Sequence, residues 1–403
     1  MKKSILQLMI LCMGILWGTS SCSHDNAPNI PQKGIVINIE KDGDLKNVEL
    51  QNVQVKLVNV NNEAQSYTFT PKVENNAFRL DVSEGIYNIT VQATAHLPGA
   101  DKAVSVYSYL RNVEVQSGEK QVTAKFEISK VSDFVLSELF VVGSKAPDGK
   151  DYRQSKYFVI YNNSDRVLYA DSLVLCETEF MSSMRRQDLS PTIFDSDVPV
   201  GVVYKIPGSG KEYPIKPGEQ IVIADIAKNH SAIQSNYPDL SKADFEWYDD
   251  NKLDEDIPTV KNLIKIYSYS KSVWTPHNLG SRSYVLAKLK VSQEDFLKNY
   301  KYSYTYNVNS AGTVKQMKGD GYKIPNNWVV DAVNHSIKNN YFWDIMSKTL
   351  DRGYTYINET DKDRNRDKAV IRKIAETKGG RKIYQDTNNS TEDFEIKKPS
   401  MVK

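Results

Sequence analysis

The chain has 403 residues, enough for two domains, and it contains 52 Lys and Arg residues against 50 Asp and Glu residues. Lys2 and Lys3 lie in an N-terminal segment that we expect to be removed, which would leave 50 basic and 50 acidic residues and a formal charge of zero. A neutral surface creates no field that attracts polyanions, so these numbers argue against nucleic acid as a partner.

Residues 1–21 have the composition of a bacterial secretory signal, with a short positive start, an apolar run over 5–17 and small residues up to Cys22. The apolar run has about 13 residues, whereas a membrane span needs about 20, so we expect cleavage. The small residues before Cys22 resemble the lipobox of bacterial lipoproteins, although Thr19 replaces the usual leucine. The resemblance implies lipid attachment at Cys22 and a tether to a membrane; the alternative is a cleaved signal with an incidental cysteine.

A first domain is expected over residues 34–130, after a polar tether at 22–33. Hydrophobic residues alternate with polar ones in short runs bounded by Gly, Asn or Asp, which is typical of antiparallel strands. About seven such runs in about 95 residues indicate a β-sandwich. Three segments resemble the transthyretin-like or carboxypeptidase-regulatory type of immunoglobulin-like module: 52–57, 76–80 and 84–91. The resemblance implies a spacer, and we expect Gly85 to allow a tight turn and Tyr87 to point inward beside it.

A second domain is expected over residues 131–403. It resembles a lamin-tail-like domain, a compact immunoglobulin-like sandwich, in four opening segments and three closing ones: 136–140, 156–165, 171–175, 215–224, 327–333, 370–374 and 386–394. The gap between the two groups predicts an insertion at about 225–325. Val159 stands where members of the family often have an acid. We therefore do not expect this chain to share a polar site with the family at that position.

The sequence therefore predicts a mainly β protein made of two immunoglobulin-like β-sandwich domains, the second with an α/β insertion. Within the insertion, residues 227–236 and 292–300 are expected to form short helices. Ser292 and Asp295 have the spacing of a capping box at the start of the second helix.

The residues that usually mark an enzyme are missing or scattered. The histidines outside the tether do not form an H-x-x-x-H or H-x-H pair, and neither a G-x-S-x-G elbow nor a phosphate loop is present. Cys176 lies in an apolar strand-like run, where a buried inert thiol is expected. The sequence thus indicates a protein that is not an enzyme and that needs no cofactor.

One acidic stretch has oxygen-bearing side chains at alternate positions, a spacing that can wrap a calcium ion. Its candidate ligands are Asp361, Asp363, Asn365 and Asp367. Arg366 and Arg372 occupy the places where an EF-hand loop has glycine and its bidentate glutamate, so a solvated hairpin loop is the favoured alternative.

Four tyrosines alternate along residues 300–306, so their rings lie on one face of the predicted strand. If this face packs on the domain, the rings are core; if it faces solvent, they form a platform for a glycan, a small flat ligand or a protein. The candidate binding residues are these four and three aromatic residues upstream: Tyr300, Tyr302, Tyr304, Tyr306, Tyr267, Tyr269 and Trp274.

Taken together, these features indicate a lipid-anchored outer-membrane protein of a Gram-negative cell envelope, on the periplasmic side or at the cell surface. The chain resembles an uncharacterised lipoprotein family often associated with TonB-dependent outer-membrane receptors, which implies a binding or accessory module that acts with such a receptor. The alternative is a structural or adhesive surface lipoprotein without a small ligand.

Overall fold

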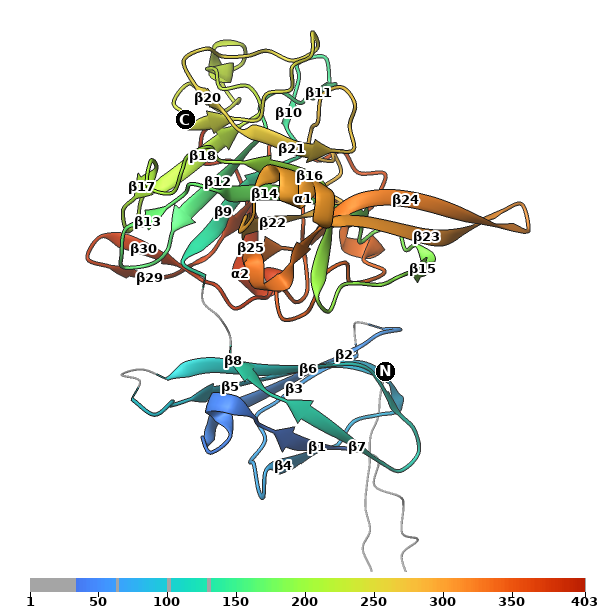
Figure 1. The fold of residues 1–403 in the computed structure, drawn as a ribbon. Helices are drawn as coiled ribbons and strands as arrows, with labels where there is room; N and C mark the ends of the chain where they lie inside the picture. Colours follow the sequence, from blue (N-terminus) through green and yellow to red (C-terminus); the bar gives the residue numbers. More distant parts are fainter. Residues whose placement is uncertain (1–33, 63–64, 100–102, 129–131, 403) are drawn as a thin grey trace, which may run out of the picture. The chain divides into compact units, whose positions relative to one another are not determined.

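The computed structural model describes residues 34–62, 65–99, 103–128 and 132–402, and the expected signal, tether and lipid-attachment residue Cys22 lie outside these ranges. The described chain is mainly β, as the sequence predicts (Figure 1). It separates into two compact units, the first built around residues 34–93 and 108–126. No helix in the described ranges is long and apolar enough to cross a membrane.

The first unit holds a three-stranded sheet, β4-β1-β7, and most of a five-stranded sheet, β3-β2-β5-β6-β8. Their elements are β1 (Gly34–Glu40), η1 (Gly43–Leu45), β2 (Leu50–Asn59), β3 (Ser66–Phe69), β4 (Ala77–Leu80), β5 (Gly85–Ala95), β6 (Val104–Val115), β7 (Glu119–Lys125) and β8 (Glu127–Ile128). Tyr87 is buried, as expected, and its hydroxyl donates to the carbonyl of Ser83 at 3.0 Å. Gly85 is needed for close approach, since a Cβ there would lie 2.6 Å from Asn59 Nδ2 and 3.1 Å from the Tyr87 ring.

The second unit is built on two large sheets. The seven-stranded sheet has the order β20 (Lys261–Asn262), β19 (Phe245–Glu246), β18 (Gln220–Ala224), β12 (Tyr157–Asn162), β9 (Phe134–Phe140), β28 (Ala369–Arg372) and β31 (Phe394–Lys397). The eight-stranded sheet has the order β15 (Gln187–Ser190), β23 (Lys301–Ser310), β24 (Thr313–Pro325), β16 (Asp197–Lys205), β14 (Leu173–Met181), β22 (Arg282–Lys288) and β25 (Val329–Val333), and β21 (Ile264–Ser268) also pairs with β16.

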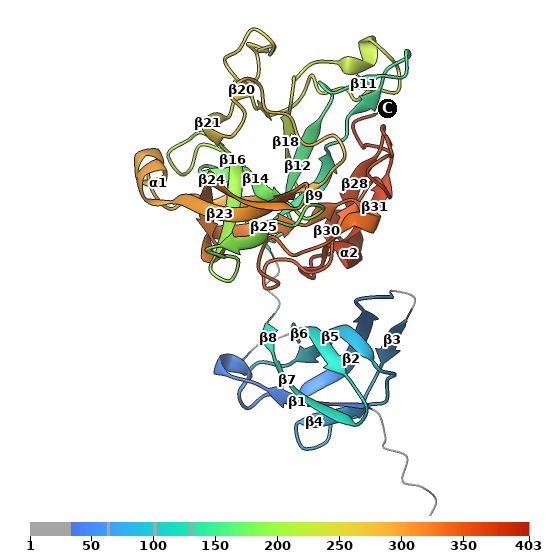
Figure 2. The ribbon, with the colours of Figure 1, turned by 90° about the vertical axis from the view of Figure 1, so that its right-hand side faces the viewer.

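Short pairs and helices complete this unit (Figure 2). The pairs are β10 (Ser144–Lys145) with β11 (Asp151–Tyr152), β13 (Leu168–Tyr169) with β17 (Pro214–Ile215), β26 (His335–Ser336) with β27 (Thr355–Tyr356), and β29 (Ile374–Lys378) with β30 (Arg381–Tyr384). The helices are α1 (Gln293–Asn299), α2 (Ser390–Asp393), η2 (His230–Ala232), η3 (Asn326–Trp328) and η4 (Lys338–Asn340).

The main core lies between the two large sheets, because alternate residues of each strand point inward. Phe158 and Ile160 of β12 contribute from one sheet, and Leu175 and Leu286 contribute from the other. The next residues along the second sheet, such as Cys176, point the opposite way into a further apolar cluster that also contains Phe296 of α1. Both faces of the eight-stranded sheet are therefore covered at β14, β16 and β22.

Part of the region 225–325, which is expected to be an insertion, contributes a strand to the eight-stranded sheet. Its strand β22 lies between β14 and β25 in the eight-stranded sheet. Tyr284 and Leu286 of β22 enter the main core, while Val285 and Ala287 enter the second cluster, so the strand is buried on both faces. A strand buried on both faces belongs to the sheet itself.

One of the two helices expected in this region forms. Helix α1 begins after Ser292, whose hydroxyl accepts the backbone N–H of Asp295 at 3.1 Å, as the capping pattern predicts. The other, over 227–236, is reduced to the single turn η2. There the side-chain oxygen of Asn229 accepts both the N–H and the hydroxyl of Ser231, and such local bonds compete with helix formation.

Candidate functional site

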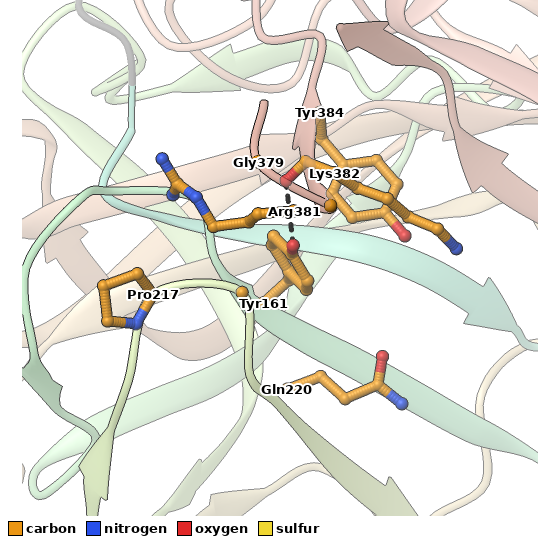
Figure 3. Close-up of a pocket in the computed structure, with 9 residues that line it drawn as sticks. Tyr161, Pro217, Gln220, Gly379, Arg381, Lys382 and Tyr384 are labelled. Carbon is orange, nitrogen blue, oxygen red and sulfur yellow. Dashed lines mark hydrogen bonds between the residues drawn. The ribbon is translucent and has the colours of Figure 1, made fainter. Parts of the chain in front are cut away.

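The hairpin β29–β30 packs against the seven-stranded sheet close to β12. Gly379 and Gly380 form its two-residue turn with φ of 57° and 81°, conformations that glycine adopts without strain. Tyr161 of β12 donates from its hydroxyl to the carbonyl of Lys382 at 2.8 Å, and its ring meets the Tyr384 ring edge-on with centroids 4.8 Å apart (Figure 3). Asn163 pairs its side chain with the backbone of Tyr384, at 2.8 and 3.0 Å, which fixes the hairpin in place.

Two neighbouring cavities lie along this hairpin. The first has a volume of about 440 Å³ and is lined by Tyr161, Pro217, Gly218, Gln220, Gly379, Gly380, Arg381, Lys382 and Tyr384. The second has a volume of about 840 Å³ and is lined by Ser137, Glu138, Val159, Gln220, Ile371, Arg372, Lys373, Ile374, Lys382, Tyr384, Glu395, Lys397, Ser400 and Met401. Gln220, Lys382 and Tyr384 line both cavities, so the two adjoin, and together they are called the hairpin groove below.

The hairpin groove combines aromatic rings with polar and cationic groups. Burial raises the pKa of Tyr161 and of Tyr384, so both phenols are protonated at neutral pH. Gln220 is exposed and offers an amide that both donates and accepts. Lys382 is exposed. The guanidinium of Arg381 donates hydrogen bonds to the backbone carbonyls of Asn163, at 3.3 Å, and of Ser164. This set suits recognition of a polar ring compound.

A buried carboxyl, Glu138, lies in the wall of the second cavity. The β9–β12 pairing shifts register between Val159 and Ile160, and this bulge sets Glu138 opposite Val159. The backbone N–H of Ser400 donates to Glu138 at 2.8 Å, and the hydroxyls of Ser400 and Tyr157 also donate to it. Burial raises the pKa of Glu138 and outweighs these hydrogen bonds. Val159 thus has an acid beside it on the neighbouring strand.

The seven predicted aromatic binding residues do not form one exposed face. Trp274, Tyr302 and Tyr304 are 1%, 3% and 7% exposed, which corrects the platform interpretation and agrees with the alternative that these rings are core. Tyr302 donates to the carbonyl of Pro191 at 2.6 Å, and Tyr304 donates to Glu179 at 2.6 Å. The alternation was right, but the face it defines packs inward.

The rest of the seven are partly exposed at most. Tyr300, Tyr306 and Tyr267 are half-buried, and Tyr269 is 42% exposed. Sequence alternation alone cannot tell a buried face from an exposed one, because both have the same period.

Tyr269 and Trp274 meet at a carboxyl that the sequence did not single out. Glu177 is fully buried and lies 3.0 Å from Tyr269 Oη, 3.4 Å from Trp274 Nε1 and 3.3 Å from Tyr284 Oη, all of which donate to it. Arg282 Nε lies 3.5 Å from the same carboxyl. Burial raises the pKa of Glu177, and a fully buried acid surrounded by donors is a structural centre rather than a binding surface.

The predicted calcium ligands do not converge, which corrects the metal interpretation. Asp363 accepts the backbone N–H groups of Glu359 and Thr360 at 2.9 and 2.7 Å. Asn365 donates to a backbone carbonyl, and Asp367 accepts the backbone N–H of Lys145 in β10. Within the described ranges, no group of three or more His, Cys, Asp or Glu side chains could hold a metal ion. The side-chain oxygens of Asp363 and Asp367 bind backbone N–H groups in different segments of the chain.

The hairpin groove was missed by the sequence analysis, although one signal for it is present. Gly379-Gly380 is a two-residue turn signal between two short segments, 374–378 and 381–384, and such a dipeptide favours a hairpin. This pattern does not indicate which part of the protein the hairpin packs against. Cys176, by contrast, is fully buried, and burial raises its pKa strongly, as expected for an inert thiol.

The profile of DUF4876, a family of proteins of unknown function, matches residues 216–401. Except for Tyr161, every residue that lines the first cavity lies in that range. A solved DUF4876 family protein from Bacteroides thetaiotaomicron is 22% identical, with 90% of this chain and 94% of that one covered and a TM-score of 0.54, which shows a shared fold.

Two other solved proteins align over much of the chain. A proposed adhesin from Bacteroides ovatus is 11% identical, covers 76% of this chain and 88% of its own, and has a TM-score of 0.19. A proposed cell adhesion protein from Bacteroides eggerthii is 9% identical, covers 73% and 80%, and has a TM-score of 0.18. These scores are too low to indicate a common fold. No curated protein matches the sequence.

Proposed function

We propose that this chain is a non-catalytic binding protein of the Gram-negative cell envelope and that the hairpin groove holds its ligand. The two adjoining cavities carry the proposal, because they share Gln220, Lys382 and Tyr384 and lie along the same hairpin of the second unit. The lining is built from a rigid sheet and a hairpin fixed to it by Tyr161 and Asn163, and rigid lining favours binding.

The chemistry of the groove supports a saccharide as the ligand. Tyr384 can offer an aromatic surface to a sugar ring, and Gln220 can exchange hydrogen bonds with its hydroxyls. Lys382 adds a positive charge that favours an acidic sugar over a neutral one. The buried acid Glu138 is occupied by Ser400 and Tyr157, so it shapes the wall and does not oppose an anionic ligand.

The N-terminal sequence supports the cellular context of the proposal. A lipid on Cys22 would hold the protein at the outer membrane, on the periplasmic side or at the surface, and the first unit would serve as a spacer. A TonB-dependent receptor is the partner that the resemblance implies, and a saccharide-binding accessory protein would fit beside a receptor that imports such a ligand.

Calorimetric titration with a panel of neutral and acidic oligosaccharides tests the groove. Wild-type protein is expected to bind an acidic member, and Tyr384→Ala and Gln220→Ala are each expected to weaken that binding about tenfold, or ~1.4 kcal/mol. Lys318→Ala is the matched control, because Lys318 is exposed on β24 and does not line the groove. Binding that is unchanged in both groove variants would place the ligand elsewhere.

A structural or adhesive role without a small ligand is the second candidate, and the hairpin β23–β24 favours it. Figure 1 shows this hairpin extending from the body of the second unit. Val308, Val314 and Met317 near its end are 38%, 62% and 43% exposed, an apolar surface that a protein partner could cover. A pull-down of the tagged protein from intact cells, compared with Val314→Asp, tests it. Loss of a captured envelope protein only in the variant would support adhesion through the hairpin.

A further inference from the structure

Lys156, which immediately precedes β12, is the one buried lysine in the part of the chain that the structure describes. Its Nζ donates to the carbonyl of Pro276 at 2.6 Å, to Oδ1 of Asn278 at 2.7 Å and to the hydroxyl of Thr275 at 3.1 Å. All three partners are uncharged oxygens from one loop, so the amine sits in direct contact with a carboxamide group.

Burial of Lys156 favours the uncharged amine, which has two N–H groups and donates to two of these three oxygens at a time. Burial lowers the pKa of Lys156 to about 7, and the opposing effects of Asp225 and Glu177 do not restore its usual value. At neutral pH a large share of the side chain is therefore a neutral amine. A lysine desolvated in this way is a nucleophile, whereas an exposed lysine is protonated and inert.

Buried acids lie on the same side of the sheet. The N–H of Asp225 donates to the carbonyl of Lys156 at 2.9 Å, which continues the antiparallel β12–β18 register one residue past Tyr157 and Ala224. Residues opposite each other in such a pair have Cβ atoms about 5 Å apart on one face. Burial raises the pKa of Asp225 strongly and also raises that of Glu177, so each carboxyl holds a proton more readily than an exposed acid does.

We propose that Lys156 and Asn278 form an intramolecular isopeptide bond. The lone pair of Lys156 Nζ attacks Cγ of Asn278, and a new C–N bond forms as the bond from Cγ to Nδ2 breaks. One proton passes from Nζ to the leaving nitrogen, so one ammonia is released and no oxidant or reductant is needed. Asp225 lies opposite Lys156 in the strand register, and in this proposal its carboxyl carries the proton.

The bond would join the beginning of β12 to the loop before β22, two segments 122 residues apart in the chain. It would lie inside the second unit and would not involve the hairpin groove. Its presence is therefore independent of the ligand and of the proposed function.

Intact mass measurement and peptide mapping of the full protein test the bond. Wild-type protein is expected to be lighter than its sequence by one ammonia, and its digest is expected to contain one branched peptide linking Lys156 to Asn278. Lys156→Arg, measured beside it, should show its full sequence mass. A wild-type digest in which both peptides are linear and unmodified would overturn the proposal, whatever the variants do.

Two further variants separate the bond from other losses of ammonia. Asn278→Asp would release water in place of ammonia, so its linked product should have the same mass as linked wild type. Asp225→Asn is expected to lower the linked fraction severalfold, while Thr275→Ala, which removes only a hydrogen bond to Nζ, should leave it near the wild-type value. A loss of ammonia that persists in Lys156→Arg would assign it to another residue.

Discussion

Arg372 lies among three buried carboxyl groups in the second unit. Its guanidinium is buried and lies 2.6 Å from Asp331, 3.4 Å from Asp386 and 3.5 Å from Asp393. The Phe394 ring packs against it at 4.6 Å. Arg372 belongs to β28 and Asp331 to β25, so this cluster joins the two large sheets. Three acids close together inside a protein are tolerated only because a cation lies among them.

Removal of the Arg372 guanidinium should lower the free energy of unfolding of the second unit. Arg372→Met is expected to destabilise the second unit by about 3–5 kcal/mol, because it leaves buried acids without a counter-charge. Denaturant unfolding followed by tryptophan fluorescence checks this, since all described tryptophans lie beyond residue 246, in the second unit. Arg364→Met is the control, because Arg364 is exposed, and it should cost less than about 1 kcal/mol. Equal costs would show that the cluster contributes no special stability.

His277 predicts a pH dependence. Its Nδ1 pairs with the hydroxyl of Ser281 at 2.7 Å, and burial, with smaller contributions from Arg282 and Lys156, lowers its pKa from 6.5 to about 4. The unfolded chain therefore binds a proton more readily than the folded chain between these values. The stability contributed by neutral His277 is present above about pH 6.5 and is lost as the pH falls toward 4.

Comparison with His277→Asn, which keeps a polar atom near Ser281, isolates this effect. The unfolding free energy of wild type relative to the variant should fall by about 1–3 kcal/mol between pH 7 and pH 4. Urea unfolding at a series of pH values measures the difference. It should be constant above pH 7, and a difference that is also constant down to pH 4 would refute the role of His277.

The hairpin β29–β30 depends on its two glycines. Because Gly379 has φ of 57°, a β-branched residue there is strained by about 1–2 kcal/mol, whereas asparagine tolerates this conformation. Gly379→Val is expected to loosen the hairpin and weaken saccharide binding, and Gly379→Asn is expected to preserve both. Hydrogen exchange of residues 374–384 and calorimetric titration measure the two effects. Loosening without loss of binding would mean that the groove does not need an ordered hairpin.

The strand β23 changes character along its length. Its beginning is core, where Tyr304 packs on Phe180 with ring centroids 4.9 Å apart and donates to Glu179. Its middle is half-buried, where Arg186 lies 4.4 Å from the centre of the Tyr306 ring. One alternating run thus serves both the interior and the surface, because the strand leaves the body before it ends.

The loss of stability on replacing a tyrosine of β23 should follow how deeply its ring is buried. Tyr304→Ala is expected to cost about 3–5 kcal/mol, since it removes a buried ring and leaves Glu179 without its donor. Tyr306→Ala is the matched control, and its cost should be clearly smaller because that ring is only half-buried. Denaturant unfolding compares the two. A larger loss at Tyr306 would contradict the burial seen here.

At the scale of the whole molecule, two units of different size follow an N-terminal segment with the features of a lipoprotein signal. If a lipid on Cys22 is the only anchor, Cys22→Ala should move the protein from the membrane fraction to the soluble fraction. Fractionation of cells that express each form measures this, and an unchanged membrane fraction would refute the anchor. Processing of both forms should be compared, because the substitution also affects lipoprotein cleavage.

Much of the architecture could be predicted from local pattern. Alternating runs predicted a mainly β chain, and they located β1 and β2 correctly because side-chain alternation is a local property of a strand. The helix after Ser292 was predictable for the same reason, since its cap is built within four residues. The place of β22 between β14 and β25 was not predictable in this way, because strand pairing joins segments that are distant in the sequence.

The site depended on contacts that no local pattern records. The hairpin groove joins Tyr161 of β12 to residues of β30 more than two hundred positions later, and Lys156 meets Asn278 across 122 residues. The sequence by itself determined the type of structure, the buried thiol and the aromatic strand. Only the tertiary structure decided which face of that strand is buried and which distant residues share a groove, because these depend on how the sheets pack on one another.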